Sequence, residues 1–288
     1  MNGYNAEKYL KEAIDSIYSQ TFKDWEIIFI DNCSTDNTRD ILNSYDNKIK
    51  YYKTDENIPI GSARNFGLKY CKGEYLAFLD TDDIWLNDKL EKQIKILDEN
   101  QNFQFCYGGV IYINEYSMEI GKMLPQSKSG NVFAQQLMRY EINQQAIVLR
   151  NNIEIEVNEA LRHAPDFNMF MNIASKYRGY VVNDYLVKYR KHSNSLTSKN
   201  IDIWWLEMKI VLDNIFKDES LRKKYSKEYK FAYAKVSYNK ARYLMSVGNQ
   251  NDANNELSRY KFIDLKYFML YVLSLFPIKI WDLVHRLK

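Results

Sequence analysis

The chain has 288 residues, of which 46% are hydrophobic, 27% charged and 15% aromatic. This composition excludes a disordered tail, a collagen-like fibre and a disulfide-stapled miniprotein. Forty Lys and Arg against 37 Asp and Glu leave a net charge of +3, too small a surplus to indicate a protein that binds a nucleic-acid backbone.

The first 100 residues alternate between helical and extended patterns. The spacing of apolar residues predicts helices over 9–18, around 41–45, over 62–72 and around 90–97, and strands over 25–30, 49–53 and 74–79. Such alternation is typical of a parallel sheet covered by helices, in which ligands bind beyond the carboxyl ends of the strands. Two polar loops, 31–36 and 80–83, follow strands of this kind. The layout therefore indicates a ligand site at these loops.

The pattern changes after residue 100. Residues 103–113 and 118–124 predict a hairpin, 146–149 a short strand, 166–177 a helix and 181–189 a further extended segment. Beyond residue 200 the pattern is almost entirely helical, and 229–247 with 251–275 are expected to form a helical pair. We therefore expect an α/β domain over residues 1–198 and a helical region over 199–288.

The C-terminal segment is unusually apolar. Residues 267–276 carry no charge, but Lys279 and Asp282 interrupt the run before it reaches the roughly 20 apolar residues that span a bilayer. One interpretation is a terminal helix packed on the domain, which we favour slightly. The other is an interfacial anchor with Lys279, Arg286 and Lys288 near lipid headgroups.

A pair of acids, Asp80 and Asp82, follows the apolar strand predicted over 74–79. If the extended geometry persists, a period of two points both side chains to one face. Two converging carboxylates suit Mg²⁺ or Mn²⁺, which keep open positions for phosphate oxygens. D-x-D by itself is a weak signal, and a solvated acidic turn is the alternative.

Four segments together carry a resemblance to the family 2 glycosyltransferases, an inverting group with a nucleotide-sugar-binding, Rossmann-like GT-A fold. Residues 3–10 resemble the opening loop and first helix of that family, and the sequence IIFIDNCSTD over 27–36 resembles its I-V-V-D-D-G-S-T-D. Residues 61–65, GSARN, resemble G-x-x-x-A-R-N, and GEYLAFLDTDD over 73–83 resembles G-E-Y-I-A-F-L-D-S-D-D. The resemblance covers residues 1–100 and continues weakly to 190–192. It implies a mostly parallel sheet flanked by helices.

The resemblance implies an enzyme of the hexosyltransferase type, which moves a sugar from a nucleotide-diphosphate sugar to an acceptor hydroxyl with inversion. It also implies a Mg²⁺ or Mn²⁺ cofactor and a saccharide or lipid-linked saccharide acceptor, in the synthesis of a bacterial cell-surface polysaccharide or glycolipid. Nucleic acid is not an expected partner. We expect a cytoplasmic protein, with peripheral attachment to the inner membrane face through the C-terminal helix as an alternative. A non-catalytic nucleotide-sugar binder of the same fold is the competing hypothesis.

The resemblance also assigns roles at the acidic loop and at the basic segment near residue 190. Asp82 is expected to ligate the metal, and Asp80 to contact the ribose or to assist at the metal. Asp83 is expected to support the loop. His192, in the sequence YRKH, corresponds to a position near the diphosphate, where it would ligate the metal or contact phosphate; a surface histidine without function is the alternative.

Four further residues are expected at the nucleotide by resemblance. Asp31 would hold the base or ribose, and Asn32 stands where a second acid is common. Arg64 would contact the nucleotide or its phosphates through its planar donors, unless it snorkels from a helix. Asn5 would lie beside the nucleotide, or it would cap the first helix.

Inversion needs one general base that takes the acceptor proton. In the family this base opens a helix in a pattern like E-D-x-D-L-x-x-R, and PDFNMFMN over residues 165–172 is the matching stretch. Asp166 is therefore the expected base. The competing role for Asp166 is that of an N-cap of the same helix.

The family normally opens with a strand of the type V-S-V-I-I-P, and Met1 stands where that strand would end. We therefore expect the first strand to be missing. Because that strand is central in a doubly wound sheet, its loss would leave both neighbours without backbone partners. Either the true start lies upstream of Met1 or the protein is clipped, and an added upstream strand is expected to raise stability.

Overall fold

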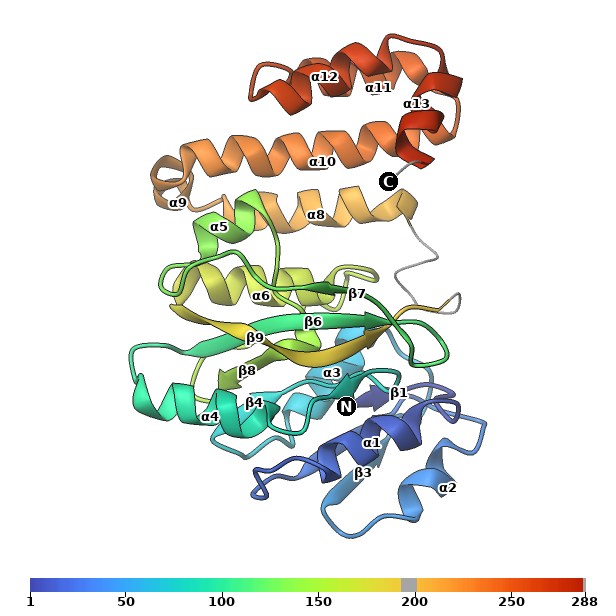
Figure 1. Ribbon diagram of the computed structural model, residues 1–288, viewed down its shortest axis with the longest axis vertical. Coiled ribbons are helices and arrows are strands. Elements are labelled where there is room, and N and C mark those ends of the chain that lie inside the picture. The colour runs from blue at the N-terminus through green and yellow to red at the C-terminus, as the bar shows by residue number, and fades with distance from the viewer. Residues whose placement is uncertain (193–200, 287–288) are drawn as a thin grey trace. The chain divides into compact units, whose positions relative to one another are not determined.

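The computed structural model describes residues 1–192 and 201–286, which fold as two compact units (Figure 1). The first unit is α/β and extends through the strand that ends at Arg190; the second is helical and begins at Ile201. The predicted domain boundary between residues 198 and 199 lies outside the described residues.

A small parallel sheet opens the first unit. Its strand order is β1–β2–β3, with β1 at Asn2–Gly3, β2 at Ile27–Asp31 and β3 at Ile49–Lys53. Every residue of β2 is buried, as expected for the central strand of a covered parallel sheet. The helices of this part are α1 (Leu10–Tyr18), α2 (Thr38–Asn43) and α3 (Ile60–Leu68). The predicted alternation of strands and helices is confirmed here, with helix ends that differ by a few residues.

A second, mixed sheet follows in the order β4–β8–β6–β9–β5, and β7 also pairs with β6. These strands are β4 (Tyr75–Ala77), β5 (Ile84–Trp85), β6 (Phe105–Ile113), β7 (Glu119–Met123), β8 (Ile147–Arg150) and β9 (Gly179–Arg190). Only β6 and β9 pair in parallel in this sheet. The prediction of a mostly parallel sheet is therefore wrong for this half. The residues between β6 and β7 are too few for a crossover, so that pair has to be antiparallel.

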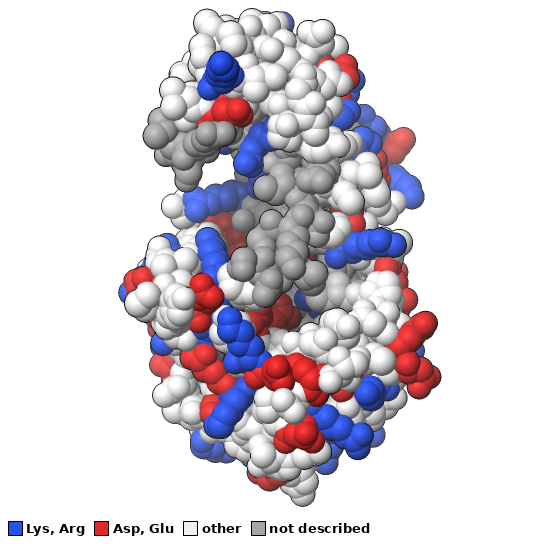
Figure 2. Space-filling model, turned by 90° about the vertical axis from the view of Figure 1, so that its right-hand side faces the viewer, with Lys and Arg blue, Asp and Glu red and all other residues white. Residues whose placement is uncertain are grey.

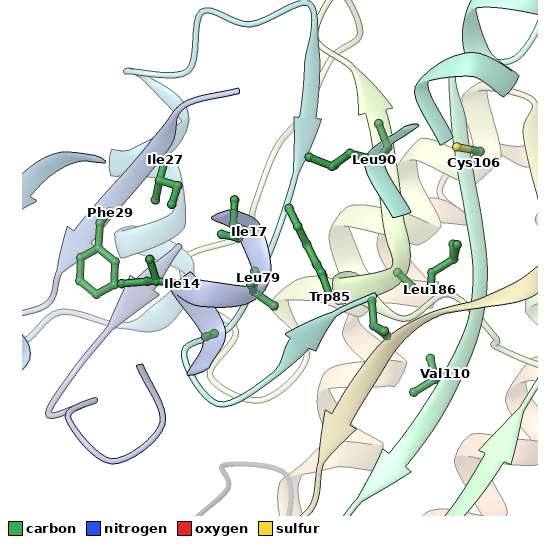
Figure 3. Close-up of a cluster of buried hydrophobic side chains, with 14 of the residues drawn as sticks. Ile14, Ile17, Ile27, Phe29, Leu79, Trp85, Leu90, Cys106, Val110 and Leu186 are labelled. Atoms are coloured by element: carbon green, nitrogen blue, oxygen red, sulfur yellow. The ribbon is translucent and has the colours of Figure 1, made fainter. Parts of the chain in front are cut away.

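The remaining helices that precede β9 are α4 (Lys89–Glu99), α5 (Phe133–Met138), the short 3₁₀ helix η1 (Gln144–Ala146) and α6 (Pro165–Lys176). Figure 3 shows apolar side chains from α1, β2, β5, α4, β6 and β9 pointing toward one another. Ile14, Phe29, Leu79, Trp85 and Leu186 are among them, and each is at most 6% exposed. This core joins both sheets, so it fixes the loops that follow β2 and β4.

The first strand is shortened rather than missing. Residues 2 and 3 pair with Ile30 and Asp31 of β2, and the Ile30 amide donates to the Met1 carbonyl at 3.0 Å. The Met1 ammonium donates to the Ile28 carbonyl at 2.8 Å, and burial lowers its pKa. In the part of the chain that the structure describes, β4 pairs only with β8. A cavity of about 670 Å³, lined by residues 24–28 and 71–80 among others, lies beside these strands.

We expect a short apolar strand joined to Met1 to raise the Tm of the first unit by about 5 °C. Such a strand would turn the buried ammonium into an amide, pair with exposed strand edges and fill apolar volume. Thermal unfolding of the extended protein measures the effect, and an extension of equal length made of Gly and Ser is the control. An unchanged Tm in the apolar extension would contradict the prediction.

The second unit is helical, as predicted. It comprises α8 (Ile201–Ile215), α9 (Glu219–Lys224), α10 (Ser226–Ser246), α11 (Gln250–Ser258), α12 (Leu265–Ser274) and α13 (Ile278–Arg286). The helix expected over 251–275 is broken in two, because the Asp264 side chain accepts from the Tyr267 amide at 2.9 Å and caps a new helix.

The apolar C-terminal segment is partly packed in a core and partly exposed. Trp281 packs in a core with residues of α10 and α11, which agrees with the favoured interpretation of a packed helix. Leu265, Phe268 and Met269, on one stripe of α12, are nevertheless 42–73% exposed. Of the helices described, none combines the length and the apolar character needed to cross a membrane.

Candidate functional site

The acids predicted to share one face lie in a turn, not in a strand. β4 ends at Ala77, and the Asp83 amide donates to the Asp80 carbonyl at 3.3 Å. The period-of-two argument for Asp80 and Asp82 therefore does not apply, because the chain leaves the extended conformation before it reaches them. Each carboxylate has its own set of partners.

Asp80 is held by side chains from η1 and α3. Gln145 Nε2 donates to Asp80 Oδ2 at 2.6 Å, and Gln145 Oε1 accepts from the Asp80 main-chain amide at 2.8 Å. Gln144 Nε2 donates to Asp80 Oδ1 at 3.3 Å, and a guanidinium nitrogen of Arg64 lies 3.6 Å from the same oxygen. Asp80 is thus oriented by two glutamines, Gln144 and Gln145, that no sequence motif had singled out.

Asp82 contacts His192, the two residues for which the resemblance implied roles at the metal or the diphosphate. His192 Nε2 lies 2.9 Å from Asp82 Oδ2, and the two side chains are 13% and 30% exposed. Burial and the negative charge of Asp80 raise the pKa of the Asp82 carboxyl, while the hydrogen bond from His192 acts against them. His192 is therefore not a lone surface histidine, and its role at a metal or a phosphate stays a prediction.

Asp83 anchors the turn, as expected. Its carboxyl is 1% exposed, and its Oδ1 accepts from the Arg190 amide at 2.7 Å. The Arg190 guanidinium, also 1% exposed, donates to the Asp82 carbonyl at 2.8 Å and to Glu12 Oε2 at 2.5 Å. It also donates to Ser117 Oγ at 2.8 Å. Arg190 therefore ties the acidic turn to α1, to the β6–β7 loop and to the end of β9.

No three His, Cys, Asp or Glu side chains among the described residues are already placed to hold a metal ion. Asp82 and His192 lie in contact, whereas the Asp80 carboxylate accepts hydrogen bonds from Gln144 and Gln145. An acid and an imidazole at a partly exposed turn, with a second carboxylate raising the local negative potential, still fit a divalent ion that takes its other ligands from a substrate. The full metal set of Asp80, Asp82 and His192 stays a prediction.

Asn5 joins two loops and does not cap the first helix. The helix begins at Leu10, with Tyr9 at the cap position and no side-chain cap. Asn5 Oδ1 accepts from the Thr35 amide at 2.9 Å, and the Asn5 amide donates to Ser34 Oγ at 2.9 Å. Its φ of 50° lies in the left-handed region, which asparagine tolerates better than most residues. Its contact with a nucleotide stays a prediction.

Asp31 and Asn32 are buried and already bonded within the protein. Asp31, 1% exposed, accepts from the Ser34 amide at 2.8 Å and from the Tyr51 hydroxyl at 2.6 Å. Asn32 donates to the Ile58 carbonyl at 2.7 Å and accepts from the Ile58 amide at 2.9 Å. These bonds give both residues a role in shaping the loop after β2. Their contact with a nucleotide is not tested by the geometry.

Arg64 and Asp166 approach the acidic turn from α3 and α6. The Arg64 side chain is 7% exposed, so the alternative of a snorkelling arginine is wrong. Asp166 lies in the first turn of α6, whose cap position is Ala164, so the alternative of an N-cap is wrong as well. Burial raises the pKa of the Asp166 carboxyl, the positive charge of Arg64 lowers it, and Asp80 raises it again. Asp80, Arg64 and Asp166 therefore belong to one electrostatic cluster.

The face of the first unit that Figure 2 shows carries charges of both signs. On the face that Figure 2 shows, Lys and Arg side chains are interspersed with Asp and Glu, and no broad basic patch covers the first unit.

The glycosyl transferase family 2 model matches residues 3–164. WfgD of Escherichia coli, described as a UDP-Glc:alpha-D-GlcNAc-diphosphoundecaprenol beta-1,3-glucosyltransferase, is 33% identical over 202 residues, which are 69% of this chain and 78% of WfgD.

Two solved structures share the fold. The S. aureus TarS 1-349 complex with UDP-GlcNAc matches with a TM-score of 0.69 and 20% identity, covering 91% of this chain and 79% of TarS 1-349. The mannosyltransferase PcManGT of Pyrobaculum calidifontis, in complex with GDP-Man and Mn²⁺, matches with a TM-score of 0.60 and 16% identity, covering 97% and 81% of the two chains.

Proposed function

The chain belongs to glycosyl transferase family 2, and from this premise we propose that it transfers a sugar from a nucleotide-diphosphate sugar to an acceptor hydroxyl with inversion. The observation that carries the proposal is the cluster at the acidic turn. Asp82 contacts His192 at 2.9 Å, and Asp80, 3.6 Å from Arg64, lies in the same electrostatic cluster as Asp166.

Asp82 and His192 would hold a divalent ion, Mg²⁺ or Mn²⁺, with Asp80 close enough to raise the negative potential there. When bound, such an ion would stabilise the charge that develops on a departing nucleoside diphosphate. Burial and the negative charge of Asp80 raise the pKa of the Asp82 carboxyl, and a bound cation would favour its charged form. The complex of PcManGT with GDP-Man and Mn²⁺ supports this assignment.

Asp166 is the proposed general base. The acceptor oxygen bonds to the anomeric carbon, and its proton passes to the Asp166 carboxylate. The bond between the anomeric carbon and the diphosphate oxygen breaks, and the electron pair leaves with the nucleoside diphosphate. Burial raises the pKa of Asp166 and so makes it a stronger base than an exposed aspartate, while the positive charge of Arg64 acts against that rise.

A saccharide or a lipid-linked saccharide is the proposed acceptor, in the synthesis of a cell-surface polysaccharide or glycolipid. WfgD, whose printed activity uses a diphosphoundecaprenol-linked acceptor, supports this class. The exposed apolar stripe of α12, with Lys261 and Lys266 nearby in the sequence, supports peripheral contact with the inner membrane face.

We expect Asp82→Asn to reduce sugar transfer at least about a hundredfold, because the amide cannot provide the charge that a divalent ion requires. A screen of UDP- and GDP-sugars by thermal shift with Mn²⁺ first identifies the donor. Transfer rates over a Mn²⁺ titration then measure the effect, with Asp46→Asn as a matched control at a solvated site. Full activity of Asp82→Asn in the presence of a chelator would overturn the metal assignment.

The competing hypothesis, a non-catalytic nucleotide-sugar binder, predicts a different result in the same screen. Such a protein would be stabilised by a nucleotide sugar but would release no nucleoside diphosphate with any acceptor. Release that depends on both acceptor and Asp82 excludes that hypothesis.

A further inference from the structure

Three side chains from one short stretch of the chain donate to three consecutive main-chain carbonyls at η1. The bonds run from Trp85 Nε1 to the Gln145 carbonyl at 3.0 Å, from Gln93 Nε2 to the Ala146 carbonyl at 3.0 Å, and from Lys89 Nζ to the Ile147 carbonyl at 3.4 Å. Donor and acceptor are 53 to 60 residues apart in the sequence. The end of β5 and the first turns of α4 thus hold the main chain of η1 at three successive points.

These three donors are buried in the core. Lys89 and Gln93 are 0% exposed and Trp85 is 6% exposed, and Lys89 Nζ lies 4.3 Å from the centroid of the Trp85 ring. Burial lowers the pKa of the Lys89 ammonium to about 7. A lysine costs free energy at such a position that an apolar side chain of similar length would not cost. What the lysine adds there is its bond to the Ile147 carbonyl.

The segment that these donors hold is the one that holds Asp80. Gln145 Nε2 donates to Asp80 Oδ2 at 2.6 Å, and the Asp80 main-chain amide donates to Gln145 Oε1 at 2.8 Å. Gln144 Nε2 donates to Asp80 Oδ1 at 3.3 Å. Gln145 therefore has its main-chain carbonyl fixed by Trp85 and its side-chain amide bonded to Asp80. One continuous series of hydrogen bonds connects α4, η1 and the acidic turn.

We propose that Trp85, Lys89 and Gln93 are positioning residues for sugar transfer, which set the orientation of Asp80 by fixing the main chain of η1. This inference rests on the proposed function, in which Asp80 contacts the ribose or assists at the metal. The three residues act on the reaction only through η1. A misplacement of about 1 Å at a reacting site can lower a rate about a hundredfold, so a loosened η1 slows transfer even when the protein stays folded.

A cycle of substitutions with Gln145 separates positioning from a contribution to stability alone. Lys89→Met keeps the length of the side chain and removes its donor, and we expect it to lower kcat/KM for the donor sugar at least about tenfold. Gln145→Met breaks the link to Asp80, so adding Lys89→Met to it is expected to change kcat/KM less than about twofold. Equal factors in both backgrounds would overturn the proposal, because Lys89 would then act independently of Gln145.

Hydrogen exchange provides a readout that does not require activity. The Asp80 amide donates to Gln145 Oε1, so its protection reports whether η1 still holds the acidic turn. At a temperature well below the Tm, we expect Lys89→Met to raise the exchange rate in a peptide covering residues 78–83 about tenfold. Unchanged exchange in the folded variant would overturn the proposal.

Arg150→Met is the matched control. Arg150 is 6% exposed, donates to the main-chain carbonyls of Phe103 and Leu97, and lies over the Tyr75 ring. It is thus a buried cation in surroundings like those of Lys89, but its bonds do not reach η1. We expect it to lower the Tm as Lys89→Met does, while kcat/KM and the exchange of the acidic turn stay within about twofold of the wild type. Equal losses in this control would assign the effect to general destabilisation.

Trp85→Phe tests the same proposal if Lys89→Met does not fold. It keeps an aromatic ring in the core and removes the donor to the Gln145 carbonyl, so the same loss of protection at the acidic turn is expected, and a turn that stays protected would overturn the proposal. A wild type that transfers no sugar, with variants that lose this protection, would contradict the proposed function alone. A wild type that transfers sugar no faster than Lys89→Met would contradict the positioning role alone.

Discussion

Asp166→Asn is expected to reduce the rate of sugar transfer by about 10²–10⁴-fold, the usual contribution of a general base. The amide has nearly the shape of the carboxylate but cannot take the acceptor proton. Because Asp166 does not cap α6, the substitution should leave the helix intact. Binding of the nucleotide sugar should therefore stay within about threefold of the wild type, since the base acts on the acceptor.

The pH dependence provides an independent test of the same residue. Burial raises the pKa of the Asp166 carboxyl above its usual range, and the base works only when it is deprotonated. kcat/KM of the wild type is therefore expected to fall as the pH drops through that raised pKa, and this acid limb should disappear in Asp166→Asn.

Asp40→Asn is the matched control, since Asp40 lies in the first turn of α2 and is exposed. Its transfer rate and pH profile should match those of the wild type. If Asp166→Asn keeps more than a tenth of the wild-type rate, the base is another residue.

Arg190→Met is expected to lower the free energy of unfolding of the first unit by about 3 kcal/mol. The guanidinium is 1% exposed, and it donates to the Asp82 carbonyl, the Asn114 carbonyl, Ser117 and Glu12. It also lies over the Tyr9 ring, with 4.4 Å to the centroid. Loss of the side chain removes the donor from the Asp82 and Asn114 carbonyls and takes the positive charge away from Glu12. Urea unfolding measures the change.

Arg190→Met should also reduce the rate of sugar transfer, even at temperatures well below the Tm of the variant. Arg190 holds the main chain of Asp82, and its own amide holds Asp83, so the turn that presents Asp82 to His192 loses its support. Arg190→Lys should recover less than half of the lost stability, because a lysine ammonium cannot reproduce the planar arrangement of donors of the guanidinium. Lys191→Met, at the exposed neighbouring position, is the control, and equal effects of the two methionine variants would contradict a specific role for Arg190.

The sequence by itself determined the family, the order of the first strands and helices, and the positions of the acids. These features are local: a buried run such as residues 27–31, an acidic loop directly after an apolar segment, and a helix that begins near Asp166 all leave a pattern within a few residues. β3 was predicted and is found at Ile49–Lys53.

The tertiary structure decided what each acid contacts. The sequence pattern predicted one shared face for Asp80 and Asp82, but the chain turns after Ala77, and Asp80 is held by Gln145 from 65 residues away while Asp82 meets His192 from 110 residues away. Arg190 reaches Glu12 across 178 residues. Contacts between such distant residues depend on how the core packs the two sheets together, and no local periodicity records that packing.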